Sequence, residues 1–453
     1  MNQRVLVSSV ILGVVWLSSL VAAEPVRVGT FAVDASPPVG SPLAYDPTKA
    51  VEIPLSCRGV VLLGAERPMV LCAVDWIGIA NGGHAAFRDA LAEAAGTTRQ
   101  RVAVHAIHQH DAPECDFSTE QLLADHGVPQ QRFDSPFGRD VMRRAAEAVR
   151  KAVQDARPVT HLGLGQATVE NVASNRRILG PDGKVKYTRW TATKDPVVRD
   201  MPVGTIDPVL RLISLWNGEQ AVVALTYYAT HPQSYYRTGK ANPDFPGIAR
   251  NQRQEATRVM HVHFNGAGGN VTAGKWNDGA PANRQVLADR VAAGMARAWE
   301  TQQKSPLSVA DLGWESVPVL LPAAPHLDEQ KLTAVLSDQK ATVAARSSAA
   351  NDLVWLRRCR AKDPIDVSCL RLGRARVLHL PGELFVEYQL AAQQLRPDLF
   401  VCLAAYGDYA PGYIGTEVAY AQGGYETSPG ASLVAPSVEK TLTAAVERVL
   451  GSR

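Results

Sequence analysis

Short apolar runs alternate along the chain with stretches in which charged residues recur at helical spacing. Residues 59–63 and 69–74 are apolar and flank the turn Glu66-Arg67-Pro68, which predicts a β-hairpin. Residues 85–95 and 139–153 are rich in alanine with charges at helical spacing, which predicts amphipathic surface helices. The alternation favours an α/β (mixed α+β) fold over an all-α or all-β one. Further strands are predicted at 102–107, 210–216, 221–229, 260–264, 377–380 and 400–406.

The remaining pattern favours one large domain over residues 24–453, because no linker rich in serine, proline or glycine divides it. At approximately 324–362 the sequence becomes polar, alanine-rich and bounded by prolines, which predicts a small helical insertion. The sequence shows no internal repeat and no low-complexity segment.

The first 23 residues have the pattern of a cleavable signal peptide. Arg4 supplies a charge, residues 5–17 form an apolar stretch, and Val21-Ala22-Ala23 offers a cleavage point. We therefore expect a secreted or periplasmic protein, with an uncleaved N-terminal anchor as the alternative. No later apolar run approaches the roughly 18 residues of a membrane span.

The composition excludes several classes of protein. With 46% hydrophobic and 20% charged residues, the chain is neither disordered nor fibrous. Its 47 basic and 44 acidic residues give a net charge of only +3, so we expect no nucleic-acid partner. Six cysteines without CxxC spacing indicate neither a disulfide scaffold nor a cysteine zinc site, although Cys359 and Cys369 could pair.

Histidines gather where a predicted strand ends. His105, His108 and His110 lie within six positions, followed by Asp111. Two residues apart in an extended chain, His108 and His110 would point the same way, and neutral imidazole is the commonest protein ligand for zinc. The H-x-H pair therefore predicts a metal site, against the alternative of solvated histidines in a polar loop.

Other predicted strands end on polar side chains of the same kind. His231 closes residues 221–229 just before Pro232, Glu383 follows residues 377–380, and tyrosines follow residues 400–406. Ligands of open α/β sheets bind outside the carboxyl ends of strands, so these ends should surround one cleft.

Two further features have equal structural and functional interpretations. The glycine-rich run at 263–272 could approach a substrate or oxyanion, or form a tight turn without a ligand. Asp75 and Asp111 could orient metal-bound imidazoles, or serve in a capped turn or salt bridge.

In chain order these motifs resemble the N-terminal catalytic domain of the neutral, non-lysosomal ceramidases. Those enzymes are zinc-dependent amidases that cleave N-acyl sphingosine into a fatty acid and a long-chain base. Residues 28–40, ending in Val33-Asp34-Ala35-Ser36-Pro37-Pro38-Val39-Gly40, look like the opening signature of that family. The other matching blocks are Ala73-Val74-Asp75, His108-x-His110, Asn175-Arg176, Ala229-Thr230-His231-Pro232, the glycine-rich turn, Pro381-Gly382-Glu383, Tyr413-Ile414 and Tyr425-Glu426.

The resemblance implies one zinc ion per chain, and a second, structural cation stays open. It implies that His110 and Arg176 line the site and hold the water or the substrate. Tyr425 matches a tyrosine that assists the developing oxyanion, and Thr272 matches a catalytic serine. The zinc ligands that the resemblance implies are His108, His231, Glu383 and Tyr413.

The sequence also departs from the family. Thr272 keeps the serine hydroxyl but adds a methyl group, and Pro411 leaves the choice between Tyr409 and Tyr413 open. The chain ends soon after Tyr425, so we expect no C-terminal sandwich domain, which puts the substrate in question.

Three hypotheses about function follow. The first is a secreted zinc amidohydrolase that cleaves the amide of a ceramide-like N-acyl lipid or a related N-acyl compound, with activated water as nucleophile. The second is a zinc hydrolase of another bond, such as an ester, because fold does not fix substrate. The third is a secreted binding protein without turnover. We expect no membrane span, while transient contact with a membrane surface stays open.

Overall fold

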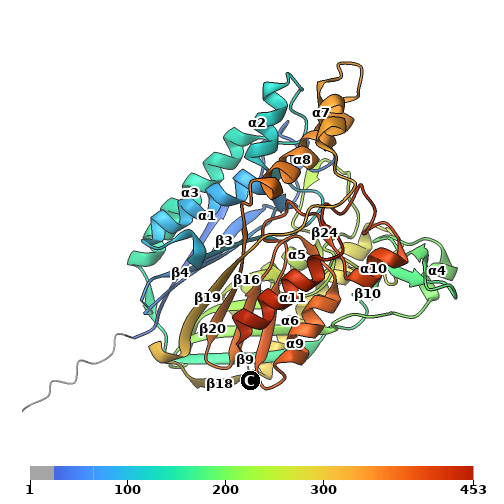
Figure 1. The fold of residues 1–453 in the computed structure, drawn as a ribbon. Coiled ribbons are helices and arrows are strands. Elements are labelled where there is room, and N and C mark those ends of the chain that lie inside the picture. Colours follow the sequence, from blue (N-terminus) through green and yellow to red (C-terminus); the bar gives the residue numbers. More distant parts are fainter. Residues whose placement is uncertain (1–24, 65, 452–453) are drawn as a thin grey trace, which may run out of the picture.

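In the computed structural model, the chain folds into three large β-sheets with helices on their outer faces (Figure 1). The structure describes residues 25–64 and 66–451, so the expected signal peptide lies outside the described residues. The mixed α/β architecture confirms the predicted fold class.

The first sheet has five strands, and its apolar residues alternate between two layers. Met69 and Leu71 face the centre of the molecule, whereas Val70 and Cys72 pack under the helices, as the period of two along a strand requires. The predicted hairpin is present as an antiparallel pair, 56–63 with 69–74. In sheet order the strands are β6 (Val102–Ala106), β4 (Met69–Val74), β3 (Ser56–Leu63), β1 (Arg27–Asp34) and β8 (Arg157–Pro158), and the covering helices are α1 (Asn81–Ala95) and α3 (Ser135–Gln154).

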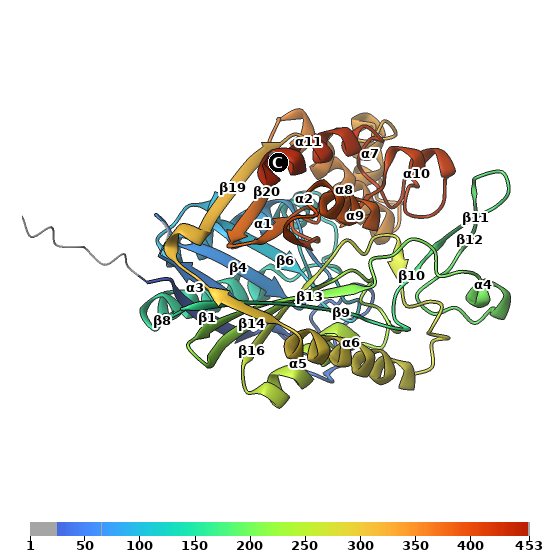
Figure 2. The same ribbon diagram turned by 90° about the horizontal axis from the view of Figure 1, so that it is seen from below.

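The second sheet also has five strands and is covered by two helices, which Figure 2 shows below it. In order, the strands are β16 (Met260–Asn265), β14 (Gln220–Tyr228), β13 (Val209–Asn217), β9 (His161–Thr168) and β18 (Gln303–Pro306). The helices are α5 (Asp244–Thr257) and α6 (Ala282–Glu300).

The third sheet has four strands and packs against two helices near the C-terminus. Its strands are β19 (Leu312–Val319), β20 (Ile365–Leu372), β21 (Ala375–His379) and β23 (Phe400–Ala404), and its helices are α9 (Val386–Leu395) and α11 (Val438–Leu450). Within 324–362 the chain forms α7 (Glu329–Ser337) and α8 (Val343–Arg360), and Leu353 of α8 packs with Leu123 of α2 (Phe117–Asp125).

The three large sheets share one construction. Each contains a single parallel pair, β4 with β6, β14 with β16 and β21 with β23, whereas all their other pairs are antiparallel. A parallel pair needs a crossover, and α1, α5 and α9 supply the three crossovers. The inner faces of all three sheets contribute side chains to one core, including Leu62, Leu225 and Val377. This repetition of architecture has no counterpart in the sequence.

Short two-stranded pairs connect the loops beyond these strands. β22 (Glu383–Leu384) pairs with β24 (Tyr413–Ile414), and β10 (Ser174–Asn175) pairs with β17 (Val271–Thr272). The remaining short elements are β2 (Ala50–Val51) with β15 (Lys240–Ala241), β5 (Gly78–Ile79) with β7 (Glu114–Cys115), β11 (Arg177–Leu179) with β12 (Val185–Thr188), α4 (Pro196–Asp200), α10 (Glu417–Gln422), and the single turns Arg99–Arg101 and Val309–Asp311.

All six cysteines are free thiols, so Cys359 of α8 and Cys369 of β20 are not bonded. Among the described residues, every helix is too short or too polar to cross a bilayer.

Candidate metal centre

His108 lies two residues beyond β6 in a left-handed backbone conformation with φ of 68°. Bulky residues rarely adopt this conformation, and such strain concentrates at functional sites. We expected an extended chain at His108 and His110, but the backbone forms a turn here. This turn brings the two imidazoles together, with their ring centroids 5.0 Å apart. The His108 Nδ1–H donates to the carbonyl of Ile77 at 2.6 Å, which leaves Nε2 with a free lone pair.

Three buried imidazoles meet at this point. The ligand atoms of His108, His110 and His231, the last just beyond β14, all lie within 4.8 Å of one another, a grouping that could hold a metal ion. His110 Nε2 and His231 Nε2 are 3.0 Å apart. The H-x-H pair and His231 come from two different sheets, so tertiary packing alone joins them.

Glu383 of β22, in the chain just beyond β21 of the third sheet, joins this group. Its Oε2 lies 3.1 Å from His108 Nε2 and 3.7 Å from His231 Nδ1. Its other oxygen, Oε1, accepts a hydrogen bond of 2.7 Å from Tyr409. Glu383 is 2% exposed, so its charge is well removed from water.

Three buried atoms at the centre lack a hydrogen-bond partner: His108 Nε2, His231 Nδ1 and Glu383 Oε2. A carboxylate oxygen accepts only, and His108 Nε2 holds a lone pair because Nδ1–H is already committed. If His231 Nε2–H donates to His110 Nε2, all three atoms are acceptors facing one another, an arrangement that a bound cation satisfies. Their separations of 3.1 and 3.7 Å bracket the roughly 3.4 Å edge of a tetrahedron with zinc–ligand bonds near 2.1 Å. The donor set fits zinc.

Tyr413 stands beside this centre. Its ring stacks parallel to that of His231, with centroids 6.3 Å apart, and its hydroxyl accepts from Arg176 Nη1 at 3.3 Å. Burial and the nearby charge of Glu383 raise the pKa of Tyr413 well above its usual value of 10.0. Burial lowers the pKa of Arg176, but the nearby Tyr413 hydroxyl and the Glu426 carboxylate outweigh it and raise that pKa above its ordinary value. Arg176 is therefore a fixed positive charge.

The structure gives Tyr409 and Tyr413 separate places. Tyr409 bonds the Glu383 oxygen that points away from the histidines, whereas Tyr413 faces His231 and Arg176. Tyr413 is thus on the side of the unpartnered atoms, and Tyr409 holds the carboxylate. Tyr406, which stacks on His108 at 4.5 Å, was not foreseen, because nothing in its sequence context distinguishes it from a core residue.

His110 is linked outward to solvent. Its Nδ1 lies 2.9 Å from Tyr45 Oη and 3.0 Å from the Gln233 amide, so this nitrogen has a partner in either protonation state. Burial, with the positive charge of Arg176 nearby, lowers the pKa of His110 well below 6.5. His110 is therefore neutral at neutral pH.

Thr272 and Tyr425 lie further out. Thr272 Oγ1 donates to the Arg189 carbonyl at 3.3 Å and accepts from the Gly274 N–H at 3.1 Å, so its partners are backbone groups and not the histidines. Tyr425 is 43% exposed, and its ring contacts that of Tyr413 edge to face at 5.7 Å. A pocket of about 160 Å³ contains Tyr425, Tyr413, His110 and Glu383 in its lining.

The glycine-rich turn packs on the strand that carries Glu383. A Cβ on Gly269 would lie 2.3 Å from the Glu383 carbonyl oxygen, so only glycine permits this approach. The Gly269 N–H donates to Leu384 at 2.8 Å. The glycine-rich turn therefore packs directly against the backbone of β22 and fixes the position of Glu383.

Neither aspartate proposed as a partner of the imidazoles contacts them. Asp75 pairs with Arg250 through two hydrogen bonds of 2.6 and 2.9 Å, and Asp111 bonds Thr238. The Ile77 carbonyl orients His108 instead. A carbonyl has no sequence signature, so this partner could not be predicted.

The sequence matches no protein-family model and no curated protein. Solved structures do match: a ceramidase complexed with C2 has a TM-score of 0.67 and 16% identity, covering 94% of this chain and 75% of its own. Neutral ceramidase from Pseudomonas aeruginosa has a TM-score of 0.67 and 15% identity, covering 94% of this chain and 74% of its own. The likeness that the sequence motifs predicted is confirmed at the level of the fold, which this chain shares with neutral ceramidase.

Proposed function

We propose that this protein is a zinc-dependent hydrolase that cleaves the amide bond of an N-acyl compound. One observation carries the proposal: three buried acceptor atoms, on His108, His231 and Glu383, converge without partners. They do so within a fold shared with ceramidase, so ceramide-like N-acyl lipids and related N-acyl compounds form the substrate class to test. The signal-peptide pattern of residues 1–23 supports export of the protein, and secretion is therefore included in this proposal.

His108, His231, Glu383 and Tyr413 would hold the metal. When bound, zinc lowers the pKa of a coordinated water to about 7 and polarises a carbonyl oxygen. The Ile77 carbonyl and Tyr409 fix the orientation of His108 and Glu383, which is the usual task of groups behind metal ligands.

The other residues supply charge and a path for protons. Water attack on an amide carbonyl places negative charge on its oxygen, and Arg176 with Tyr425 provides positive charge and a donor there. His110 lies between His231 and Tyr45, and its ring would take a proton from the attacking water and return it to the amine nitrogen as the C–N bond breaks. Because the pKa of His110 is lowered, the ring is neutral and able to accept a proton.

The test combines metal content with turnover. We expect the purified protein to contain close to one zinc per chain by mass spectrometry, and to release acetate from C2-ceramide or from simple N-acetyl amines. His108→Ala should lose the zinc and lower kcat/KM by more than about 100-fold. His326→Ala removes an exposed histidine elsewhere and should change neither quantity.

His110→Ala separates two ligand sets. If His231 donates to His110, as we infer, this variant keeps its zinc and loses turnover. Loss of zinc would instead show that the three histidines are the ligands. Turnover of p-nitrophenyl esters but of no amide, or a zinc-free protein, would contradict the proposed function.

A further inference from the structure

The exposed aromatic side chains of the described residues gather around the metal pocket. The large hydrophobic side chains that are at least 36% exposed include four aromatic ones, Tyr45, Trp190, Tyr236 and Tyr425. Aromatic rings exposed together on one surface mark binding sites more often than chance exposure does. We call these four residues the aromatic rim.

The rim forms two walls. On one side Tyr45 stacks on His110, with centroids 5.7 Å apart, and contacts Tyr236 at 4.9 Å. On the other side Trp190 contacts Tyr425 at 5.2 Å, and the Arg176 guanidinium lies over both rings. Tyr45 and Tyr425 line the same pocket, so the two walls flank its entrance.

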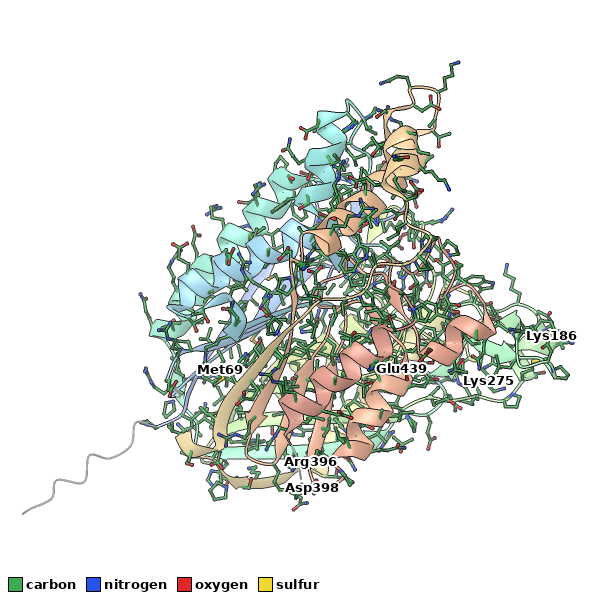
Figure 3. The ribbon with its side chains drawn as sticks, viewed as in Figure 1. Met69, Lys186, Lys275, Arg396, Asp398 and Glu439 are labelled. Carbon is green, nitrogen blue, oxygen red and sulfur yellow. The ribbon has the colours of Figure 1, made fainter. Side chains whose placement is uncertain are left out.

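The two loops behind the rim are tied together. Asn277 Nδ2 donates to the Thr191 carbonyl at 2.8 Å and to the Ser234 carbonyl at 2.6 Å, which joins the loops that carry Trp190 and Tyr236. Asn277 is fully buried. Figure 3 shows Lys186 and Lys275 on the side of the molecule opposite Met69 at the start of β4. A rim fixed in advance loses little entropy when a ligand binds.

The floor of the pocket is polar. Its lining includes the carboxylates of Glu383 and Asp352, the Arg132 guanidinium and the hydroxyls of Tyr409 and Tyr413. The lining contains one aliphatic side chain larger than alanine, Leu433. A volume of about 160 Å³ is below the 300–1,000 Å³ usual for ligand pockets, so it admits only a small group.

A neighbouring pocket that shares part of this lining runs past an ion pair whose arginine is half-buried and whose glutamate is buried. This pocket of about 350 Å³ shares Tyr45, Arg132 and Tyr409, and Arg132 there binds Glu114 through hydrogen bonds of 2.6 and 2.8 Å. An alkyl chain gains about 0.8 kcal/mol for each CH₂ that leaves water for apolar surroundings. An alkyl chain that lies along the Arg132–Glu114 pair gains much less free energy per CH₂, because it also removes water from two charged groups.

Resting on the proposed function, we propose that the substrate is a compact N-acyl amine with a polyhydroxylated amine part, such as an N-acylated amino sugar. A sugar ring has an apolar face for an aromatic wall and hydroxyl edges for the polar floor. A short acyl group matches the small volume beside Glu383 and Tyr413. A long-chain ceramide would have to lay its chains over Ile77 and Val343 of the neighbouring pocket, beside the Arg132–Glu114 pair.

The first test is equilibrium binding to the zinc-free protein, which does not depend on turnover. N-Acetylglucosamine should bind with a millimolar Kd, measured by calorimetry and by quenching of tryptophan fluorescence. Trp190→Ala should weaken binding roughly 5- to 10-fold, and Trp190→Phe should restore most of it. Val286→Ala, an exposed residue on α6, should leave Kd unchanged.

The second test compares substrates with the zinc-loaded enzyme. We expect kcat/KM for N-acetylglucosamine to exceed that for C16-ceramide in mixed micelles at least 10-fold, with Trp190→Ala raising KM and leaving kcat. The proposal is overturned if N-acetylglucosamine fails to bind, if the rim variants bind it normally, or if kcat/KM rises with acyl length. Binding of the wild type, but not of Trp190→Ala, to anionic phospholipid vesicles would also overturn it by making the rim a membrane contact. Sugar binding without turnover of any amide would refute the proposed function and leave the rim assignment standing.

Discussion

At the residue scale, the centre depends on side chains whose second polar atom is already committed. His108 gives one nitrogen to the Ile77 carbonyl, and Glu383 receives the Tyr409 hydroxyl on one oxygen. The other nitrogen and oxygen therefore face the cavity in one orientation. Such preorganisation lowers the cost of holding a cation, because the ligands need not be reoriented.

Removing the Tyr409 hydroxyl tests this positioning. Tyr409→Phe leaves the ring against His108 but frees Glu383 Oε1. We expect zinc affinity to fall about 10- to 100-fold, measured by competition with a chromophoric chelator. Tyr388→Phe also removes a buried hydroxyl bond, to the Gly415 carbonyl at 3.0 Å, and should leave zinc affinity unchanged. Equal affinities in the two variants would show that Tyr409 does not position the carboxylate.

At the element scale, a buried ion pair connects the first sheet to the second. Asp75, directly beyond β4, receives two hydrogen bonds from Arg250 of α5 and two more from Ser56. Both charged side chains are fully buried. This pair fixes the end of β4 against α5, close to where His108 leaves β6.

The pair gives stability a defined pH dependence. Burial raises the pKa of Asp75, but Arg250 outweighs it, and the net pKa lies below 3.8. A carboxyl whose pKa is lowered by folding stabilises the protein above its unfolded pKa. That contribution is lost as the pH falls below 3.8 through the folded value. We expect the free energy of unfolding to decline over this range, as measured by urea denaturation.

Asp75→Asn should remove this acid dependence and cost about 3–5 kcal/mol at neutral pH, because Arg250 is left buried without a counter-charge. Asp140 pairs with Arg143 and Arg144 on the exposed face of α3, so Asp140→Asn is the matched surface control and should change the melting temperature little. If the two variants were equally stable, the Asp75–Arg250 pair would have no structural importance.

At the scale of the whole molecule, the three sheets deliver the site together. Each contributes one parallel pair, and the chain beyond those pairs provides His108, His231 and Glu383 in turn. Carboxyl ends of parallel strands meet at one edge, so three similar units bring residues far apart in sequence to one point. A bound cation should therefore connect all three sheets and stabilise their packing against one another.

Zinc should accordingly stabilise the whole fold. Binding only to the native state adds RT ln(1 + [L]/Kd), about 4 kcal/mol when free zinc exceeds Kd 1,000-fold. We expect EDTA to lower the melting temperature by several degrees in differential scanning calorimetry, in one cooperative transition. His108→Ala should show no response to EDTA. A zinc-dependent shift in that variant would place the stabilising ion elsewhere.

The sequence by itself determined the elements and most of the chemistry. Alternating apolar residues predicted the strands because side chains along a strand face opposite sides, and the predicted hairpin and helices are present. The sequence also predicted that His108, His231 and Glu383 belong to a site. Each of them follows an apolar run that ends in a polar side chain, and such side chains at strand ends commonly bind ligands. The family motifs, in order along the chain, predicted the fold that the solved structures share.

Only the tertiary structure decided which atoms meet. The left-handed turn at His108, the Ile77 carbonyl behind it and the stacking of Tyr406 depend on distances across sheets, which no local pattern encodes. The three sheets share one construction, yet the sequence contains no internal repeat. Many different apolar sequences form the same type of strand, so similar sheets need not have similar sequences. Burial, too, is a property of the packed molecule, and it lowers the pKa of His110 well below that of a solvated imidazole.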